Sequence, residues 1–391
     1  MNILIAGGGI GGLSAALSLA KFGHNVTVLE QASAFEEVGA GLQISPNGMK
    51  VLRELGLSEA VRSAGFEPEQ IELRFGESGQ TIFNIPLKVR AIKRWGAPFV
   101  QIHRADLLHV LAEAAEAHPN IRVVFQSRVE RFEEMPESVR VMTSSNRILE
   151  GDLLIGADGI HSTIREQMFG QDSPEFTGCV AWRGVVNLDQ FSNPPPPNAV
   201  AWVGRGKHAV TYRLRQGRLV NFVGVVERED WRDESWSKFG MKDQIRKDFE
   251  GWHSVIRNII EQGESFFQWG LFGRAPLNRW SSQRVTLLGD SVHPMLPFLA
   301  QGAVMAIEDG WVLAKCLDSQ MELSSQLTMY EQIRRPRTSK VQKRSLDNKT
   351  TFHHSSELMR AGTYGPMWLA GKFMPEFVHS RMDWIYGHDV I

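Results

Sequence analysis

The sequence predicts an α/β protein in which a domain built on a parallel sheet holds an inserted and mainly antiparallel β domain and ends in C-terminal helices. Three observations predict this class. Apolar strand patterns run into glycine-bearing turns at three places, near residues 6, 156 and 288. Tryptophan and β-branched runs dominate 177–270, and helical patterns return after residue 302. This order is typical of an α/β domain with a sheet-rich insertion.

The first unit runs from Asn2 to Glu30 and contains a short apolar strand, a glycine turn, an apolar helix and a second strand. Gly7, Gly9 and Gly12 have the G-x-G-x-x-G spacing. The first glycine permits a tight turn, the second lets a pyrophosphate approach the backbone, and the third lets the helix pack against the strand. The helix N-terminus offers N–H groups to phosphates, and a terminal acid can bind ribose hydroxyls. The unit therefore predicts a dinucleotide site of Rossmann type.

The next elements alternate between helix and strand patterns. We expect a helix over 48–55 that Asn47 caps, and a short helix capped by Ser58. The remaining predicted elements are strands at 71–75 and 81–84, a helix from Arg104 to about His118, and strands at 120–125 and 139–143.

Two later units repeat the strand-to-turn pattern of the N-terminus. In the first, an apolar strand leads into a turn with Asp158 and Gly159, and a helix follows through Arg165. In the second, residues 284–288 lead into a turn with Asp290, and a helix continues to about residue 317. Ligands of open α/β sheets bind at the carboxyl ends of the strands, so both turns are predicted to face the same ligand.

The inserted region reads as an antiparallel sheet, and the C-terminal part reads as helices. Strands are expected at 180–184, 200–203, 208–214 and 218–226, with helices at 241–249, 253–262 and 325–345 and a helical, aromatic tail from about residue 355. Pro336 is expected to kink the long helix, and the basic run 334–344 is interpreted as a solvated helix face.

These patterns give a division into three parts. The nucleotide-binding domain takes residues 1–72, 97–176 and 271–345, and the inserted domain takes 73–96 and 177–270. Residues 346–391 form a C-terminal helical segment.

Composition excludes several classes of partner. The net charge of −1 gives no electrostatic basis for binding nucleic acid. No stretch approaches the ~18 apolar residues of a spanning helix, so no integral membrane contact is expected. Cys179 and Cys316 have no metal-ligand spacing, and the N-terminus lacks the basic leader of a signal peptide. A cytoplasmic protein without a metal site is expected, as a monomer or homodimer.

The order of the three turns carries a resemblance. Three motifs follow one another: Gly7–Gly12, then 156–159, then Gly289-Asp290 with His293 and Pro297. In this order they resemble the motifs of the class A flavoprotein aromatic monooxygenases. The branch most similar to it contains salicylate hydroxylase, 3-hydroxybenzoate 6-hydroxylase and 6-hydroxynicotinate 3-monooxygenase. The segments that resemble this branch are 39–43, Arg104, 182–184, 300–303 and 384–387.

The resemblance implies a resident FAD in a Rossmann-like FAD-binding domain, with the inserted β domain binding substrate. It assigns contacts with the ADP half to Gly7, Gly9, Gly12 and Glu30, and contacts with the phosphate and ribityl part to Arg104 and Asp290. Asp158 and Gly159 belong to the motif shared by FAD and NAD(P)H. Along the isoalloxazine the resemblance places Pro297, Gly302 and Ala303, and in the flavin loop it places Gln43. A second Rossmann fingerprint is absent from the sequence, so NADH or NADPH is expected to bind transiently.

The reacting end is predicted at His208 and Tyr212, which lie four residues apart on one strand and hence on one face. In the resembling branch such a pair points into the substrate pocket. The resemblance implies that reduced FAD and O2 form a C4a-hydroperoxide, which hydroxylates a hydroxylated aromatic or N-heteroaromatic acid, with or without decarboxylation. His208 would act as base, Tyr212 would orient the substrate, and Gln301 would hydrogen-bond a substrate oxygen near the flavin.

Alternatives remain open at this point. The same fold could serve a tailoring hydroxylase or epoxidase of a larger aromatic or quinone, or a flavin-binding regulatory protein without turnover. His293 is interpreted as structural beside Asp290, and His353-His354 lacks metal-ligating partners at suitable spacing. Arg183 could pair a substrate carboxylate or a group within the sheet.

Overall fold

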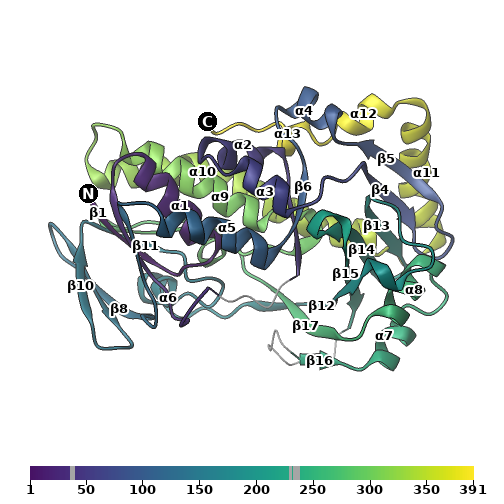
Figure 1. The fold of residues 1–391 in the computed structure, drawn as a ribbon, viewed down its shortest axis with the longest axis horizontal. Coiled ribbons are helices and arrows are strands. Elements are labelled where there is room, and N and C mark those ends of the chain that lie inside the picture. The colour runs from purple at the N-terminus through teal and green to yellow at the C-terminus, as the bar shows by residue number, and fades with distance from the viewer. Residues whose placement is uncertain (36–39, 229–230, 232–237) are drawn as a thin grey trace.

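A computed structural model describes residues 1–35, 40–228, 231 and 238–391 (Figure 1). Residues 36–39 lie outside the described residues, and with them Gly39, the first residue of the segment 39–43. Residues 229–230 and 232–237 of the inserted region lie outside them as well.

The nucleotide-binding part is built on a five-stranded parallel sheet in the order β18-β11-β1-β2-β7. Its strands are β1 Asn2–Ala6, β2 Asn25–Leu29, β7 Ile121–Val124, β11 Leu153–Gly156 and β18 Val285–Leu287. The strands that carry the three predicted turns, β1, β11 and β18, are immediate neighbours. The turns therefore meet at the carboxyl ends of neighbouring strands, which confirms the predicted Rossmann-like arrangement.

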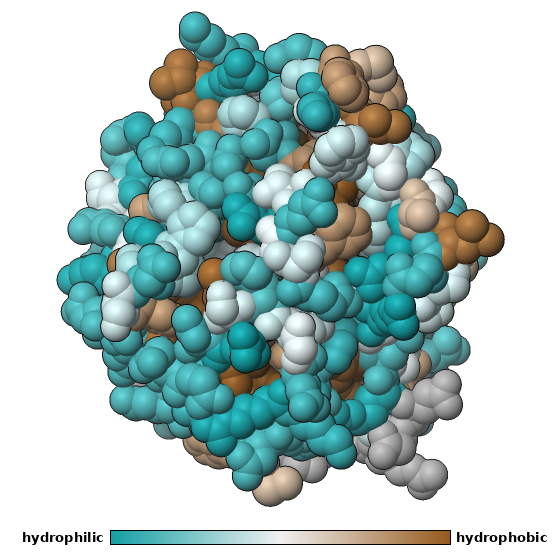
Figure 2. All heavy atoms as spheres, turned by 90° about the vertical axis from the view of Figure 1, so that its right-hand side faces the viewer, coloured by the Kyte–Doolittle hydropathy of each residue, from teal (hydrophilic) through white to brown (hydrophobic). Residues whose placement is uncertain are grey.

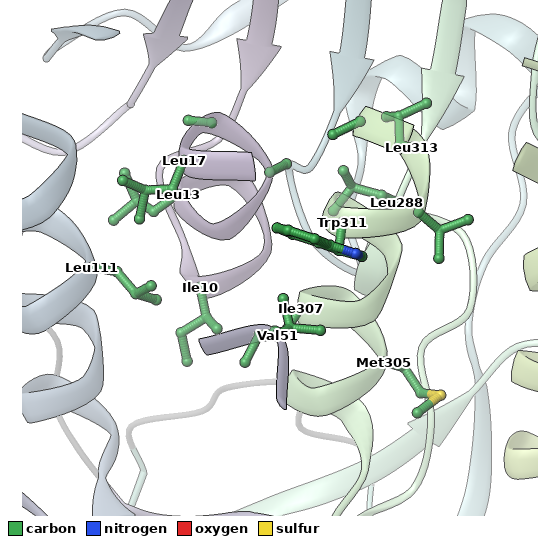
Figure 3. Packing of buried hydrophobic residues seen from close by; sticks show 14 of the residues in the cluster. Ile10, Leu13, Leu17, Val51, Leu111, Leu288, Met305, Ile307, Trp311 and Leu313 are labelled. Carbon is green, nitrogen blue, oxygen red and sulfur yellow. The ribbon is translucent and has the colours of Figure 1, made fainter. Parts of the chain in front are cut away.

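Long helices cover this sheet. They are α1 Ile10–Lys21, α5 Arg104–Glu116, α9 Gly302–Leu317 and α10 Leu323–Phe352. Ile10 of α1 lies close to Ile307 of α9, and Trp311 of α9 points toward α1, in a shared apolar core (Figure 3). Close approach of the two helices depends on Gly310, because a Cβ there would lie 2.7 Å from the Cα of Ala15. This packing fixes the position of the α9 N-terminus relative to the glycine turn.

Two predicted helix caps are wrong. Helix α2 spans Pro46–Glu54 and α3 spans Ser58–Ala64, so Asn47 and Ser58 lie inside the helices. Their cap positions are Ser45 and Leu57, and neither makes a side-chain cap hydrogen bond. Pro46 starts α2 early because proline is favoured at the first helical position.

Smaller elements complete this part of the chain. β3 Gly41–Ile44 pairs with β6 Val100–His103, and β8 Val129–Glu134, β9 Val139–Thr143 and β10 Ile148–Gly151 form a three-stranded sheet. The short helix α4 Val89–Trp95 precedes β6 in sequence, and α6 Thr163–Phe169 follows β11.

The inserted region forms an eight-stranded sheet in the order β16-β17-β12-β15-β14-β13-β4-β5. Its strands are β4 Gln70–Phe75, β5 Thr81–Pro86, β12 Glu175–Asn187, β13 Ala199–Gly204, β14 Lys207–Leu214, β15 Leu219–Glu227, β16 Lys238–Gly240 and β17 Phe266–Gly273. All neighbouring pairs are antiparallel except β13 and β4. The expectation of a mainly antiparallel sheet is confirmed.

The two faces of this sheet differ. On the outer face, Trp182, Trp202 and Phe222 pack against α7 Lys242–Asp248 and α8 Ser254–Gln262. Side chains alternate along each strand, so the neighbouring positions point to the inner face, toward the part of the chain built on the parallel sheet. His208 and Tyr212 belong to this inner set, as the sequence predicts.

The C-terminal segment is helical, as expected, with α11 Glu357–Phe373, α12 Pro375–Ser380 and α13 Asp383–Tyr386. The predicted helix at 325–345 is longer in the structure, where α10 contains Pro336 in its interior. Figure 2 shows a largely hydrophilic face with hydrophobic groups in its upper part. None of the described helices combines the length and apolar character needed to cross a membrane.

Candidate active site

One large cavity lies between the edge of the parallel sheet and the inner face of the eight-stranded sheet. Its volume is about 1710 Å³, above the range of ~300–1,000 Å³ usual for a single small-molecule site. It therefore has room for a dinucleotide and a second ligand. Every residue that the sequence predicts for the site lines this cavity, with the exception of Gly12.

The glycine turn has two kinds of glycine. Gly7 has φ +103°, and a Cβ there would lie 2.5 Å from the carbonyl oxygen of Ala157. A Cβ on Gly12 would lie 2.0 Å from the carbonyl oxygen of Gly7, which is why Gly12 faces the strand and not the cavity. A Cβ on Gly9 would meet no protein atom within 4 Å. Gly9 thus lies at the uncapped N-terminus of α1 with open cavity beside it, which fits a bound pyrophosphate.

Glu30 has a structural role that the sequence did not reveal. Its Oε2 accepts a hydrogen bond from the backbone N–H of Gly8 at 2.7 Å, and its Oε1 accepts one from Ala32 at 2.8 Å. The carboxylate also lines the cavity. Glu30 therefore holds the glycine turn in place and retains lone pairs for ribose hydroxyls.

The two acids of the later turns face the same cavity. Asp158 accepts a hydrogen bond from the backbone N–H of Ile164 at 3.2 Å, and Gly159 follows with φ +80°. Burial raises the pKa of Asp158. The surrounding protein also raises the pKa of Asp290, and the positive charge of Arg104 acts in the opposite direction. Asp290 is exposed toward the cavity, so its carboxylate is available to a polyhydroxyl chain.

The turn before α9 brings backbone donors to the cavity. The 3₁₀ turn η4 Pro297–Leu299 ends at Ala300, which has φ +51°, and α9 begins at Gly302. No side chain caps this helix, so the N–H groups near Gly302 and Ala303 are available to a ligand that carries negative charge. This geometry fits the N1–C2=O edge of a flavin.

Gln301 lies at the start of α9 with its amide already engaged. Its Nε2 donates to Ser45 Oγ at 2.9 Å, and its Oε1 accepts from Asn47 Nδ2 at 3.2 Å. The side chain is 2% exposed. These two bonds orient the amide, which has two N–H donors and two oxygen lone pairs and so keeps capacity for a further hydrogen bond.

A buried network of ion pairs joins α9 to α10, behind the turn that precedes α9. Glu308 accepts hydrogen bonds from Asn47, Arg334 and Arg337, at 2.6 to 2.8 Å. Arg334 also donates to Asp309 at 2.7 Å. Burial alone would raise the pKa values of both acids, but the arginines, and His293 beside Asp309, lower them to about 2.

This network corrects two interpretations of the sequence. The basic run 334–344 is not wholly a solvated face, because Arg334 is fully buried by pairing with acids of the preceding helix. His293 is structural as expected, but its partner is Asp309 at 2.6 Å and not Asp290. The pairing of Arg334 depends on the packing of α10 against α9, which the sequence does not specify.

The opposite wall of the cavity carries His208 and Tyr212 on β14. The His208 ring is 2% exposed and lies between the rings of Phe298 and Phe352, with centroids 5.1 and 5.2 Å away. Tyr212 packs so closely against Gly41 that a Cβ there would lie 2.4 Å from its ring. Burial raises the pKa of Tyr212, so its hydroxyl remains a hydrogen-bond donor at neutral pH.

The sequence missed the partner of His208. Its Nδ1 shares a hydrogen bond of 2.6 Å with Nε2 of His353, and Nδ1 of His353 lies 3.0 Å from Glu227 Oε1. Burial, and then the neighbouring His353, lower the pKa of His208 well below its usual value. His353 lies 145 residues away, and only its histidine type gave a signal. Within the described residues, no three His, Cys, Asp or Glu side chains form a metal-binding group.

Two further side chains line the same space. Gln43, on β3, faces the cavity opposite the eight-stranded sheet. Arg183, on β12, faces the cavity with its guanidinium 4.3 Å from the ring centroid of Trp269. Its stacked position brings a positive charge to the inner face of the sheet.

Comparison with known sequences gives matches over nearly the whole chain. The FAD binding domain family matches residues 1–345. The 3-amino-4-hydroxybenzoate 2-monooxygenase PtmB3 of Streptomyces platensis is 35% identical, over 99% of this chain and 96% of the relative. 3-Hydroxybenzoate 6-hydroxylase 1 of Aquipseudomonas alcaligenes is 34% identical, over 100% of this chain and 98% of the relative.

Solved structures share the architecture. HpxO of Klebsiella pneumoniae, complexed with FAD and uric acid, has a TM-score of 0.87 at 25% identity, with 99% of this chain and 96% of that chain covered. A salicylate hydroxylase substrate complex has a TM-score of 0.82 at 24% identity, with 100% and 96% covered, and this likeness concerns the fold.

Proposed function

Since this chain belongs to the class A flavoprotein aromatic monooxygenases, with FAD as cofactor, we propose that it hydroxylates a hydroxylated aromatic or N-heteroaromatic acid, with or without decarboxylation. One observation carries the proposal: a single cavity joins the dinucleotide edge of the parallel sheet to the wall with His208 and Tyr212. A regulatory role without turnover would not require a base at this wall.

The proposed chemistry divides between cofactor and protein. When bound, FAD that has been reduced by NADH or NADPH activates O2 and supplies the oxygen atom. His208 accepts the proton of the substrate's ring hydroxyl at Nε2, because its Nδ1 is engaged with His353. The phenolate that results is more electron-rich than the neutral phenol. Tyr212 donates a hydrogen bond that orients a substrate oxygen, and the amide of Gln301 hydrogen-bonds a substrate oxygen near the flavin.

The cofactor contacts are proposed as the sequence predicts them. Gly7, Gly9, Gly12 and Glu30 form the ADP end, and Arg104, Asp158, Gly159 and Asp290 form the middle. Pro297, Gly302, Ala303 and Gln43 surround the flavin ring. Arg183 adds a positive charge on the substrate side, which favours an acidic substrate.

A second candidate keeps the fold and enlarges the substrate. The cavity volume of about 1710 Å³ is compatible with a tailoring hydroxylase or epoxidase of a larger aromatic or quinone. Turnover of bulky compounds alone, with no turnover of single-ring acids, would favour this candidate.

The test uses the purified, FAD-loaded protein. A panel of hydroxybenzoates and hydroxypyridine carboxylates is added, NADH and NADPH oxidation is followed, and products are identified by mass. We expect His208→Ala to lower coupled hydroxylation by about 10²–10³-fold, in the range of general acid–base effects, while FAD content stays unchanged. Normal hydroxylation by this variant would refute the assignment of His208 as base.

The remaining expectations are part of the same proposal. We propose a cytoplasmic enzyme, as monomer or homodimer, that uses O2 and a transient nicotinamide cofactor. We also propose that residues 1–72, 97–176 and 271–345 bind FAD, that 73–96 and 177–270 bind substrate, and that 346–391 form a helical segment beside them. Light scattering of the FAD-loaded protein distinguishes the two oligomeric states.

A further inference from the structure

Three side chains from distant parts of the sequence form a line from the cavity to the surface. His208 lines the cavity, His353 follows the C-terminus of α10, and Glu227 ends β15. The nitrogen-to-nitrogen distance between the two rings is 2.6 Å, and the nitrogen-to-oxygen distance to Glu227 is 3.0 Å. The His353 side chain is 1% exposed, whereas that of Glu227 is 47% exposed. The line therefore begins at the substrate wall and ends in solvent.

The backbone holds these three groups together. The N–H of Gly206, in the turn between β13 and β14, donates to the carbonyl oxygen of His353. The carbonyl oxygen of Gly206 accepts a hydrogen bond from the N–H of Glu227 at 2.9 Å. One turn thus fixes both the end of α10 and the end of β15, so the alignment does not depend on side chains alone.

The line also has a direction. A carboxylate at Glu227 accepts the Nδ1 proton of His353, which leaves Nε2 of His353 as an acceptor. His208 then donates its Nδ1 proton to His353, and Nε2 of His208 remains unprotonated on the substrate side. This is the tautomer that a base at the cavity wall requires.

Burial destabilises the protonated, charged form of His208, because the charge is removed from water. His208 is packed between aromatic rings beside a second imidazole, and two adjacent imidazolium rings would repel each other. Burial lowers the pKa of His353 too, although Glu227 acts to raise it. A proton accepted by His208 is therefore more stable once it has been passed on.

We propose that His353 and Glu227 form a proton relay, which moves the proton of the substrate hydroxyl from His208 to solvent. This inference rests on the proposed function of the same site. The substrate O–H bond breaks and an N–H bond forms at His208 Nε2. The Nδ1 proton of His208 moves to Nε2 of His353, and the Nδ1 proton of His353 moves to Glu227 and then to water. No electrons are transferred, and return of a proton to the product resets both tautomers.

The charged groups around the relay are few among the described residues. Lys349, on α10, lowers the pKa of His353, and its ammonium group is anchored to the carbonyl oxygen of Thr177 at 2.6 Å. Cys179, on β12, lies opposite Glu227 in the sheet register and is buried. Phe298 and Phe352 face His208 as neutral rings. His353 and Glu227 act through His208, so they are positioning residues in this reaction.

The first test needs no ligand. Nitrogen-15 NMR of FAD-loaded protein with labelled histidine reports which ring nitrogen of His208 carries the proton, with His208→Asn for assignment. We expect protonation at Nδ1 in the wild type and a mixture of both tautomers in Glu227→Leu. Protonation of wild-type His208 at Nε2 would overturn the proposal.

The second test measures the proton transfer itself. 3-Hydroxybenzoate and 4-hydroxybenzoate are bound to the FAD-loaded protein without reductant, and phenolate absorbance is followed after a rapid rise in pH. We expect the ionisation rate to fall by about 10–100-fold in His353→Gln and Glu227→Gln, at unchanged FAD content. Added imidazole should restore the rate in His353→Ala. His354→Asn is the matched control, because the adjacent His354 bonds to Thr363 and lies outside the relay.

The outcomes separate the relay from the proposed function. Wild-type rates of ionisation in His353→Gln would overturn the relay, even if the wild type hydroxylates its substrate. Slowed ionisation and imidazole rescue would support the relay, even if no member of the panel is hydroxylated. If neither benzoate ionises on the wild-type protein, the relay is refuted for hydroxybenzoates, and the NMR result decides whether the aligned tautomers exist at all.

Discussion

The two walls of the cavity are built in different ways. The dinucleotide wall consists of backbone: glycine turns, helix N-termini and strand ends, with side chains such as Glu30 bonded to the turn itself. The wall proposed for the substrate consists of side chains on the eight-stranded sheet, with His208, Tyr212 and Arg183 among its polar groups. Under the proposed function, the first wall binds the cofactor largely through fixed backbone groups, and the second can change its ligand by exchange of side chains.

The difference lies also in sequence distance. The glycine turn and its second strand fit within residues 2–30. The relay behind His208 brings together residues 208, 227 and 353. A change in the first wall should therefore disturb folding or cofactor binding, and a change in the second should disturb chemistry in a folded flavoprotein.

The largest expected effect is at Gly12. Gly12→Val places a Cβ 2.0 Å from the carbonyl oxygen of Gly7, which is backbone and cannot move aside. We expect the loss of soluble folded protein, measured by expression and circular dichroism. Gly9→Ala is the matched variant, because its Cβ meets no protein atom within 4 Å. It should fold normally and bind FAD less tightly, and normal FAD affinity would show that the pyrophosphate lies elsewhere.

The fold was predictable because its units are local. Each strand-to-glycine-turn unit has its whole signal in fewer than about thirty residues, and the three units carry the parallel sheet. The caps at Asn47 and Ser58 were mispredicted because both residues are also tolerated inside helices. Asn47 donates a hydrogen bond to Glu308 on another helix, and no local sequence pattern predicts this contact.

The site was predictable only where chemistry follows a motif. Fourteen of the positions that the sequence predicts for the site line the cavity, because strand ends and alternation determine direction, and their roles stay predictions. The burial of Arg334 was not predictable, because it depends on the packing of α10 on α9 and not on composition. His353 was visible as a histidine, but its contact with His208 requires the path of α10 across the domain.

A smaller effect, on stability, is expected in the buried ion network behind the dinucleotide wall. The pKa of Glu308 is lowered from 4.5 to about 2 in the folded protein. This contributes about 3 kcal/mol to the free energy of unfolding above pH ~4.5, and the contribution is lost as the pH falls toward ~2. Glu308→Gln should lower the free energy of unfolding by about that amount at pH 7, as measured by urea titration.

The pH dependence makes this prediction specific. The difference between wild type and Glu308→Gln should shrink steadily from pH ~4.5 down to ~2, because the wild-type carboxyl is protonated in that range. Glu59→Gln is the control, since Glu59 forms an exposed pair with Arg62 and should change stability little. A constant difference across this pH range would mean that the variant acts by lost packing and not by lost charge.

The smallest effect is expected at Tyr212, where the two walls touch. Tyr212→Phe keeps the ring that packs against Gly41 and removes only the hydroxyl. The loss of one hydrogen bond to the substrate, about 1.4 kcal/mol, should lower coupled hydroxylation about tenfold at unchanged FAD content. Gly41→Ala should have the larger effect, because its Cβ displaces the ring and disturbs both walls. If Tyr212→Phe hydroxylates normally while Gly41→Ala does not, the tyrosine serves as a spacer between the walls, and the polar chemistry of the substrate wall rests on His208.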